Sequence, residues 1–352
     1  MKSNSNKEVL IAGRRIGRGV RPFIIAEIAQ AHDGSLGTAH AYIDAVADIG
    51  VDAVKFQTHI ADEESTFDEA FRVHFSTQDN SRFDYWKRME FTEPQWRELA
   101  QHAEARGLVF LSSAFSVAAV ELLDRLGISA WKVGSGEFWS NDLLEAMVAT
   151  NKPLLISTGL CGYDDIDNLT SGLTARSVPY ALFQCTSMYP SPLETVGLNL
   201  IDDLSSRYEC PVGLSDHSGS VFPSLAAIAR GCPLVEVHVT FHKKCFGPDV
   251  ASSLDLDQLK LLVQGRDEIF SMLSSEGNKE IQQKKLESTK KLFRKSLALR
   301  EDQVSGVQIS REHLTTKKPG SGIPPEKMQQ VLGKVLKRDV KKNRLLNWQD
   351  FV

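Results

Sequence analysis

The 352-residue sequence lacks a long apolar run, a secretory signal and a surplus of basic charge. No apolar stretch approaches the ~20 residues of a membrane-spanning helix, and residues 1–17 lack the apolar core of a secretory signal. Lysine and arginine number 41 against 45 aspartate and glutamate, so the formal net charge is −4 and no excess is available for nucleic acid or an anionic membrane. We therefore expect a soluble, cytoplasmic protein with no nucleic-acid or membrane partner.

Cysteine is scarce, and its spacing excludes two kinds of framework. The five residues are odd in number, widely separated and include no CxxC pair; they are Cys161, Cys185, Cys210, Cys232 and Cys245. This pattern favours neither a disulfide framework nor a structural zinc site. We expect reduced thiols in structural positions.

Short β-branched apolar runs alternate with Ala- and Leu-rich amphipathic stretches from residue 23 to about 272. This alternation is typical of a parallel sheet whose strands are joined by helices. Eight runs are present, at 23–28, 53–58, 109–114, 130–135, 154–158, 180–186, 212–216 and 234–240. Eight strands favour a (β/α)8 barrel over a doubly wound sheet, and no GxGxxG turn follows the first run. The sequence therefore predicts an α/β fold with a TIM barrel over residues 1–273.

The connection over residues 59–93 is longer than a usual βα loop and is rich in charged and aromatic side chains. Its aromatic residues are Phe71, Phe75, Phe83, Tyr85 and Trp86. Two interpretations stay open, a flap over an active site and a surface hairpin that covers the top of the barrel.

The composition changes after residue 273. Residues 274–291 are polar and highly charged, as expected of a linker. Residues 292–352 contain short apolar segments and a PGSGIPP turn cluster, which indicates a small second domain. A domain of that size buries a limited core, so we expect it to lean on the barrel or on a partner subunit.

Polar side chains recur at the carboxyl ends of all eight predicted strands, where barrel enzymes hold their active sites. They are Glu27, Lys55, Gln57, Ser112, Ser113, Lys132, Ser135, Glu137, Ser157, Ser187, Tyr189, Ser215, His217 and His238. Two lysines among several hydroxyls favour a cradle for phosphate or carboxylate, because both donors bind anionic oxygens. A single lysine could instead reach solvent and a single serine could cap a strand, so the argument rests on the recurrence.

His217 follows the seventh predicted strand and His238 lies within the end of the eighth, and these two strands are neighbours in a closed barrel. Their imidazoles could share one divalent metal that keeps open positions for water and for a polarised carbonyl. The alternative is a pair of buried, hydrogen-bonded histidines.

Two carboxylates at strand ends are candidates for proton transfer, because burying a carboxylate is costly unless function or pairing keeps it. These are Glu27 and Glu137, and ion pairs with the two lysines are the alternative interpretation. Asp249, in the loop after the last strand, could accept hydrogen bonds from a polyol, as could Tyr189 and Gln57.

Nine segments of the chain together resemble one enzyme family. They are FIIAEIAQAHDGSL (23–36), AVKFQTH (53–59), KVGSGE (132–137), LLISTGL (154–160), QCTSMYPSP (184–192), GLSDHS (213–218), EVHVTF (236–241), GPDVASSLD (247–255) and TTKKPGSGIPP (315–325). In order and spacing they are similar to the phosphoenolpyruvate-condensing sialic acid (nonulosonic acid) synthases. The resemblance implies a (β/α)8 barrel, a linker and a C-terminal antifreeze-like (SAF) domain over residues 292–352. It also implies a homodimer in which that domain is swapped onto the partner's active site.

The resemblance further implies a reaction and a set of site residues. The family joins phosphoenolpyruvate to a hexose-derived aldehyde, typically N-acetylmannosamine, with Mn²⁺ or Mg²⁺, and releases a nine-carbon 3-deoxy-2-keto sugar acid and phosphate. Phosphoenolpyruvate would be held by Lys55, Ser113, Lys132, Ser135, Ser157, Ser187 and Ser215. The metal would be held by His217 and His238, and the chemistry assisted by Glu27, Glu137 and Lys132. The sugar would be contacted by Gln57, Tyr189, Asp249 and Lys318.

Three positions depart from the family's pattern. Ala31 replaces the asparagine of a Gly-x-Asn-His motif, and Val237 replaces the arginine of a Glu-Arg-His segment. Lys318 replaces the arginine of Lys-Arg-Pro-Gly, and an ammonium cannot reproduce a bidentate guanidinium fork. The resemblance therefore indicates the reaction class more firmly than the sugar.

Two other functions fit the same residues. A Schiff-base aldolase would use Lys132 or Lys55 as its nucleophile. A catalytically silent barrel would only bind sugar, although such a binder has no need of a two-histidine metal site.

Overall fold

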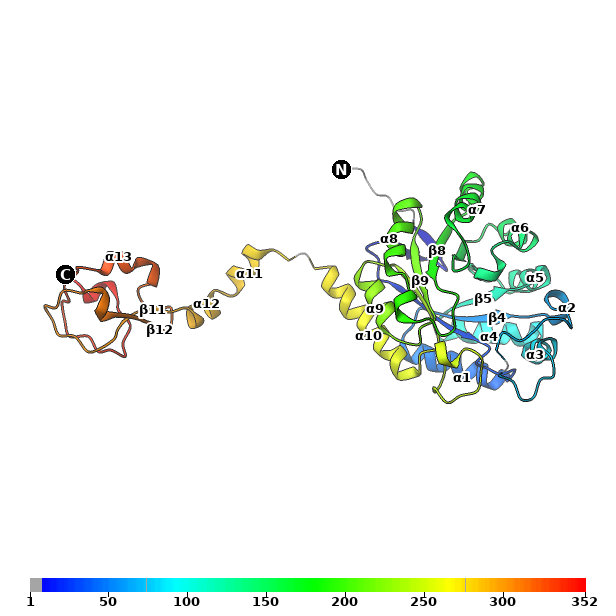
Figure 1. The fold of residues 1–352 in the computed structure, drawn as a ribbon, viewed down its shortest axis with the longest axis horizontal. Coiled ribbons are helices and arrows are strands. Elements are labelled where there is room, and N and C mark those ends of the chain that lie inside the picture. The colour runs from blue at the N-terminus through cyan, green and yellow to red at the C-terminus, as the bar shows by residue number, and fades with distance from the viewer. Residues whose placement is uncertain (1–7, 74, 276) are drawn as a thin grey trace. The chain divides into compact units, whose positions relative to one another are not determined.

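The computed structural model describes residues 8–73, 75–275 and 277–352. The chain forms two compact units, Met1–Ser274 and Ser275–Val352 (Figure 1). All five cysteines are free, as the sequence predicted. Among the described residues, no helix combines the length and apolar character that crossing a membrane requires.

The first unit is a closed barrel of eight parallel strands in the order β10-β3-β4-β5-β6-β7-β8-β9 (Figure 1). The strands are β3 (Phe23–Ala29), β4 (Ala53–Thr58), β5 (Val109–Ala114), β6 (Trp131–Val133), β7 (Leu154–Ser157), β8 (Tyr180–Cys185), β9 (Val212–Asp216) and β10 (Leu234–His238). Each predicted strand is present and ends within two residues of its predicted bounds. The predicted α/β barrel class is therefore confirmed.

Helices surround the strands on the outside of the barrel (Figure 1). They are α1 (Leu36–Ile49), α4 (Glu93–Ala105), α5 (Val117–Arg125), α6 (Asn141–Ala149), α7 (Tyr163–Ala175), α8 (Leu198–Arg207), α9 (Phe222–Ala229) and α10 (Leu256–Leu273). Local caps begin several of them: Ser35 accepts from the backbone N–H of Thr38, and Asp255 forms a capping box with Gln258. Their apolar faces pack on the outward side chains of the strands to form the main core.

The pleat of the strands decides which side chains enter the barrel, because successive residues point to opposite faces. In β10, Val235 and Val237 belong to the outer core, whereas Leu234 belongs to a separate inner cluster. Glu236 and His238 share the face of Leu234 and therefore point into the barrel. The same alternation directs inward the polar residues near the ends of the other strands.

A short antiparallel hairpin precedes the barrel and was not predicted. It consists of β1 (Val9–Ile11) and β2 (Arg14–Ile16). Val9, Ile11 and Ile16 join the inner apolar cluster formed by the first residues of the barrel strands. The hairpin thus closes the amino-terminal end of the barrel, and the polar carboxyl end is left open.

The long connection over residues 59–93 contains α2 (Ala61–Glu64) and α3 (Arg82–Met89). We call residues 59–93 the flap segment. It has a small core of its own, in which Tyr85, Trp86 and Met89 are buried and Phe75 packs against them. Other side chains of the flap segment lie outside this small core and line the open end of the barrel.

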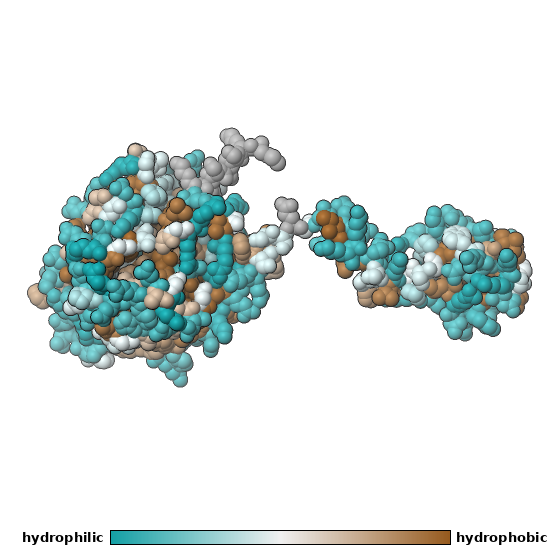
Figure 2. Space-filling model, turned by 180° about the vertical axis from the view of Figure 1, so that it is seen from behind, coloured by the Kyte–Doolittle hydropathy of each residue, from teal (hydrophilic) through white to brown (hydrophobic). Residues whose placement is uncertain are grey.

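The second unit has its own apolar core, which includes Leu297, Leu314 and Leu346. Its elements are α11 (Lys279–Lys285), α12 (Glu287–Phe293), β11 (Ser296–Leu299), β12 (Leu314–Lys317) and α13 (Met328–Val331), and β11 pairs antiparallel with β12. Two short helices, α11 and α12, therefore occupy much of the stretch whose composition predicts a linker. Figure 2 shows hydrophobic residues along this stretch, beyond the grey residue 276.

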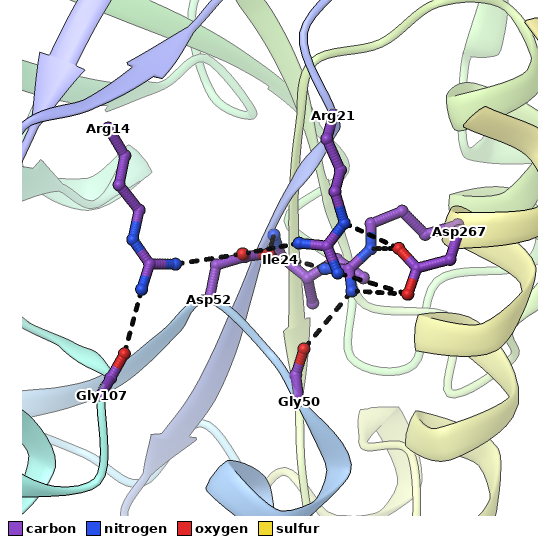
Figure 3. Close-up of polar contacts among 8 residues, drawn as sticks. Arg14, Arg21, Ile24, Gly50, Asp52, Gly107 and Asp267 are labelled. Atoms are coloured by element: carbon purple, nitrogen blue, oxygen red, sulfur yellow. Dashed lines mark hydrogen bonds and ion pairs between the residues drawn. The ribbon is translucent and has the colours of Figure 1, made fainter. Parts of the chain in front are cut away.

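A network of charged side chains surrounds Asp52, just before β4 (Figure 3). The Asp52 carboxylate accepts from Arg266 Nη1 at 2.6 Å and from the backbone N–H of Ile24 at 2.9 Å. Arg14 Nη1 and Arg21 Nη1 donate to it at 3.1 and 3.2 Å. Arg266 is fully buried, and its guanidinium is compensated by Asp52 and by the partly exposed Asp267, which accepts from Arg266 Nε at 2.9 Å. The network joins the hairpin, the starts of β3 and β4, and α10.

Replacing Asp52 with Asn is expected to lower the free energy of unfolding by about 3 kcal/mol, because it leaves the buried guanidinium of Arg266 with only the partly exposed Asp267 as a charged partner. Urea denaturation would measure the change. The matched control is Asp48→Asn, which removes an exposed carboxylate paired with Arg106 and is expected to leave the midpoint unchanged. Equal midpoints for wild type and Asp52→Asn would contradict the argument.

Candidate active site

A cavity of about 720 Å³ opens at the carboxyl ends of the barrel strands. Fourteen residues that the sequence predicts for the barrel site line it: Glu27, Lys55, Gln57, Ser113, Lys132, Ser135, Glu137, Ser157, Ser187, Tyr189, Ser215, His217, His238 and Asp249. The prediction was wrong for Ser112, which alternates with Ser113 along β5, is fully buried outside the cavity and donates to the Phe56 carbonyl oxygen at 3.1 Å. The remaining predicted residue, Lys318, lies in the second unit, where its Nζ is 5.1 Å from the ring centroid of Phe293. The cavity also takes residues from the flap segment, among them His59, Glu64 and Arg72.

Four charged side chains are buried together at the base of this cavity, and we call them the base cluster: Glu27, Lys55, Lys132 and Glu236. Lys55 Nζ contacts the Glu27 carboxylate and lies 3.8 Å from Glu236 Oε2. Lys132 Nζ lies 3.2 Å from Glu236 Oε1. Neither lysine extends to solvent, since each is at most 4% exposed. The pairing interpretation thus holds for Glu27, whereas Glu137 pairs with no lysine in the described residues.

Serine hydroxyls surround the base cluster. Ser113 Oγ accepts from Lys55 Nζ at 3.1 Å, and Ser157 Oγ accepts from Lys132 Nζ at 2.7 Å. A hydroxyl that accepts from an ammonium keeps its own O–H to donate elsewhere. The ammonium and hydroxyl donors therefore converge on the base of the cavity, where an anionic ligand would be stabilised.

The two carboxyls of the base cluster differ in their affinity for a proton. Burial raises the pKa of Glu27 more than the nearby Lys55 lowers it. Burial also acts to raise the pKa of Glu236, but Lys132 and Lys55 together hold it below its ordinary value. Glu236 therefore stays ionised between the lysines, and Glu27 is the group that can hold or release a proton near neutral pH.

Gly159 allows three side chains to approach one another beside the base cluster. A Cβ at this position would lie 2.5 Å from both Cys185 Sγ and Ser187 Oγ. The backbone N–H of Gly159 donates to Ser135 Oγ at 3.1 Å. A larger residue would displace the two serines that the sequence predicts as ligands.

His217 and His238 lie side by side, with ring centroids 5.3 Å apart. His217 Nδ1 lies 2.9 Å from the Thr186 carbonyl oxygen, which can only accept, so Nδ1 carries the proton and the lone pair is on Nε2. Burial lowers the pKa of His217 and that of His238 to about 3, so both rings are neutral at physiological pH. Neutral imidazoles, one with its tautomer fixed by a carbonyl, fit a divalent metal. Among the described residues, no third His, Cys, Asp or Glu completes a metal-binding group.

The upper wall of the cavity carries further carboxylates. Burial raises the pKa of Glu137, whose Oε2 accepts from Ser140 Oγ at 2.9 Å. Arg72 Nη2, from the flap segment, donates to Asp249 Oδ1 at 3.1 Å, and its guanidinium lies 4.5 Å from the ring centroid of Tyr189. The flap segment therefore reaches across the opening to residues predicted to bind a sugar, which favours the flap interpretation over a surface hairpin.

Sequence reasoning missed several residues of this cavity. Glu236 could have been found, because it lies two residues before His238 and so on the same face of the strand. Gln30 lines the cavity with a buried side chain amide that has no hydrogen-bond partner among the described residues. His59, Glu64 and Arg72 had no periodic signal, because they lie beyond the regular strands.

Residues 42–278 match the NeuB family, and residues 294–352 match the SAF domain. The chain is 31% identical over 341 residues to the N,N'-diacetyllegionaminic acid synthase of Legionella pneumophila, which covers 95% of each chain. It is 30% identical over 330 residues to the N-acetylneuraminate-9-phosphate synthase of Homo sapiens, covering 92% of this chain and 91% of that protein. The solved structure of the N-acetylneuraminic acid (sialic acid) synthetase from Leptospira borgpetersenii matches with a TM-score of 0.70 and 26% identity, over 80% of this chain and 96% of that one.

Replacing Glu27 with Gln is expected to flatten the pH dependence of stability above the ordinary pKa of a glutamate. A carboxyl with a raised pKa in the folded state binds its proton more tightly when folded, so its stabilisation is full at low pH and is lost as the pH rises towards the raised pKa. Urea midpoints measured from about pH 5 to about pH 7.5 should therefore fall less in the variant than in the wild type.

The control for that experiment is Glu93→Gln, because a hydrogen bond from Arg125 lowers the pKa of the wild-type Glu93 carboxyl, which has no contact with the base cluster. Its stabilisation is present above the unfolded pKa and is lost as the pH falls, so this variant should change the slope on the acid side only. A Glu27→Gln variant with the wild-type slope would show that Glu27 does not take up a proton in this window.

Proposed function

Because this chain belongs to the NeuB family and is an enzyme of the nonulosonic acid synthase class, a transferase, we propose that it condenses phosphoenolpyruvate with a hexose-derived aldehyde. The products are a nine-carbon 3-deoxy-2-keto sugar acid and phosphate. The base cluster with its serines carries the proposal, since two buried ammonium groups and several hydroxyls suit a small ligand with a phosphate and a carboxylate. The proposed substrates are phosphoenolpyruvate and an amino-sugar or sugar aldehyde. The proposed location of the reaction is the cytoplasm.

Phosphoenolpyruvate is held at the base of the cavity. Lys55 and Lys132 supply the positive charge, and the serines that line the base supply neutral donors. These serines are Ser113, Ser135, Ser157, Ser187 and Ser215. The hydroxyl of Ser215 donates to Glu236 Oε1 at 3.1 Å in this structure, so it would have to turn to donate to the ligand. Glu236 lies near both ammonium groups and partly compensates their positive charge when no ligand is bound. The ammonium donors are therefore already oriented when the anion arrives.

Carbon–carbon bond formation and proton movement follow from the geometry above this base. C3 of phosphoenolpyruvate attacks the aldehyde carbon, water adds at C2, and the resulting tetrahedral intermediate loses phosphate by cleavage of its C–O bond. Burial raises the pKa of Glu27 to about 7, so this carboxyl can exchange a proton near neutral pH. Burial also raises the pKa of Glu137, which lines the same cavity and is the second candidate for proton transfer. Glu27 acts at the base beside Lys55, and Glu137 acts at the upper wall.

His217 and His238 would hold Mn²⁺ or Mg²⁺, which when bound would polarise the aldehyde carbonyl. The protein's own contribution is to keep both rings neutral by burial and to direct Nε2 of His217 into the cavity through the Thr186 carbonyl. Tyr189 packs against His217 with ring centroids 4.2 Å apart and limits its rotation.

The acceptor sugar lies between these histidines and the flap segment. Gln57, Tyr189 and Asp249 line this part of the cavity and offer hydrogen-bonding groups to its hydroxyls. We further propose a homodimer in which Lys318 of the SAF domain reaches the acceptor in the partner's cavity. Of the three departures from the family pattern, Val237 faces the outer core and Ala31 packs against that core, so neither side chain lines the cavity. Lys318 is therefore the departure that could distinguish this acceptor from that of the family pattern.

Phosphate release from phosphoenolpyruvate is expected to require both a divalent metal and one acceptor sugar. The panel contains N-acetylmannosamine, mannose, their 6-phosphates and diacetamido-trideoxyhexoses, each with Mn²⁺ and again with a chelator. Activity that is indifferent to the chelator and lost with borohydride would indicate a Schiff-base aldolase instead. No release with any sugar, and no calorimetric binding of phosphoenolpyruvate, would leave a sugar-binding barrel.

Replacing His217 with Ala is expected to weaken Mn²⁺ binding by about 100-fold or more, because losing a ligand costs more than losing a ligand's hydrogen-bond partner. Calorimetry with Mn²⁺ measures the affinity directly, and phosphate release should fall with it. The control is His242→Ala, at an exposed histidine outside the cavity lining. Wild-type Mn²⁺ affinity in His217→Ala would remove the proposed metal site.

A further inference from the structure

His59, which follows β4, is held in a stack of aromatic rings on the cavity wall. Its ring lies 3.8 Å from that of Trp86 at 17°, and 4.4 Å from that of Phe115 at 10°, measured between centroids. The guanidinium of Arg82 lies 4.7 Å from the Trp86 centroid, and Trp86 Nε1 donates to Glu69 at 3.0 Å. Stacking on both faces fixes the plane of the imidazole and leaves only its two nitrogens to make hydrogen bonds.

Both nitrogens of His59 face oxygen atoms that accept hydrogen bonds. Nδ1 lies 2.5 Å from Glu64 Oε1, and the other oxygen of Glu64 accepts from the backbone N–H of Ile60 at 3.3 Å. Nε2 lies 3.4 Å from the amide oxygen of Gln57. A carboxylate and an amide oxygen cannot donate, so both contacts are hydrogen bonds only when the ring donates from Nδ1 and from Nε2.

The consequence concerns the amide of Gln57. Its oxygen is directed at His59, and its NH₂ group has no hydrogen-bond partner within the described part of the chain. Gln57 lines the cavity. The NH₂ group is therefore the part of this side chain that remains for a ligand.

We propose that His59 and Glu64 are positioning residues that orient the Gln57 amide, so that the acceptor must present an oxygen lone pair, from a hydroxyl or an acyl carbonyl, at this point. This inference rests on the proposed function. Neither residue needs to touch the substrate. An acceptor sugar with an ammonium at the same position would place its N–H donors against the NH₂ group of Gln57, also a donor, and would bind poorly.

The test is Glu64→Gln, which keeps the size of the side chain and removes its charge. Without the carboxylate the ring binds one proton fewer, Nε2 becomes an acceptor, and the Gln57 amide turns its oxygen towards the sugar. We expect KM for the acceptor to rise about tenfold, while KM for phosphoenolpyruvate and kcat stay within about twofold. A general loss of structure would raise both KM values together and overturn the proposal.

A double variant shows whether Glu64 acts through Gln57. Because Gln57→Ala removes the amide altogether, adding Glu64→Gln should raise the acceptor KM no further than Gln57→Ala alone. Additive effects of the two substitutions would contradict the proposal. A fall in kcat without a change in the acceptor KM would also contradict it, because Glu64 would then act through Glu137. The matched control is His102→Asn on α4, where a histidine pairs with Asp44 at 3.1 Å outside the cavity, and both KM values should stay at the wild-type level.

A measurement that needs no turnover separates this proposal from the proposed function. In ¹⁵N spectra of the histidine-labelled full chain, both ring nitrogens of His59 should be protonated in the wild type and only one in Glu64→Gln. If no acceptor on the panel is turned over, these spectra still decide the orientation of Gln57. A singly protonated His59 in the wild type would overturn the inference even in an active enzyme.

Discussion

The rest of the site depends on the burial of four charges inside the barrel. Each of these ions would cost several kcal/mol to bury alone, and the cost is offset because Glu27 lies beside Lys55 and Glu236 lies near both lysines. The four side chains come from β3, β4, β6 and β10, which are brought together only when the barrel closes. The ion pairs hold the two lysine ammonium groups in place when no anion is bound. An arriving anion must therefore compete with the glutamates for the lysines. The raised pKa of Glu27 eases that competition, because a protonated Glu27 leaves the cluster with excess positive charge.

The period of the strands builds this arrangement in layers. Ile25, Leu155 and Leu234 form part of the inner apolar cluster. Two residues further along the same strands, the same face carries Glu27, Ser157 and Glu236. An apolar layer and a layer of charges and hydroxyls are therefore two residues apart along each strand. The β1–β2 hairpin covers the far side of the apolar layer. The apolar layer keeps water from reaching the base cluster from below, which strengthens the electrostatic interactions above it.

The same period explains how far the sequence can be interpreted. The eight strands were predictable because each is a β-branched apolar run, and the polar residues at their ends line one cavity because parallel strands end at one side of a barrel. Glu236 was within reach of that argument. The hairpin was not, because its three-residue strands lie outside the alternation of strands and helices, which located even the three-residue β6. The partners of Asp52 and the stack around His59 join residues far apart in the sequence, and no spacing along the chain reveals which of them meet.

The base and the upper wall of the cavity differ in charge, and this difference assigns different tasks to the two ends. At the base, ammonium groups and hydroxyls select an anion through charge. The upper wall is richer in carboxylates than in arginines: Glu64, Glu69, Glu137 and Asp249 lie there with Arg72 and Arg82. A substrate pair with one anionic member therefore has one favourable orientation. An uncharged acceptor sugar would have no charge by which to be recognised, so its recognition would depend on the direction of individual donors and acceptors. A lone amide such as Gln57 can turn over at little cost, and it becomes selective only when a second group holds one end of it, which is the position that His59 occupies.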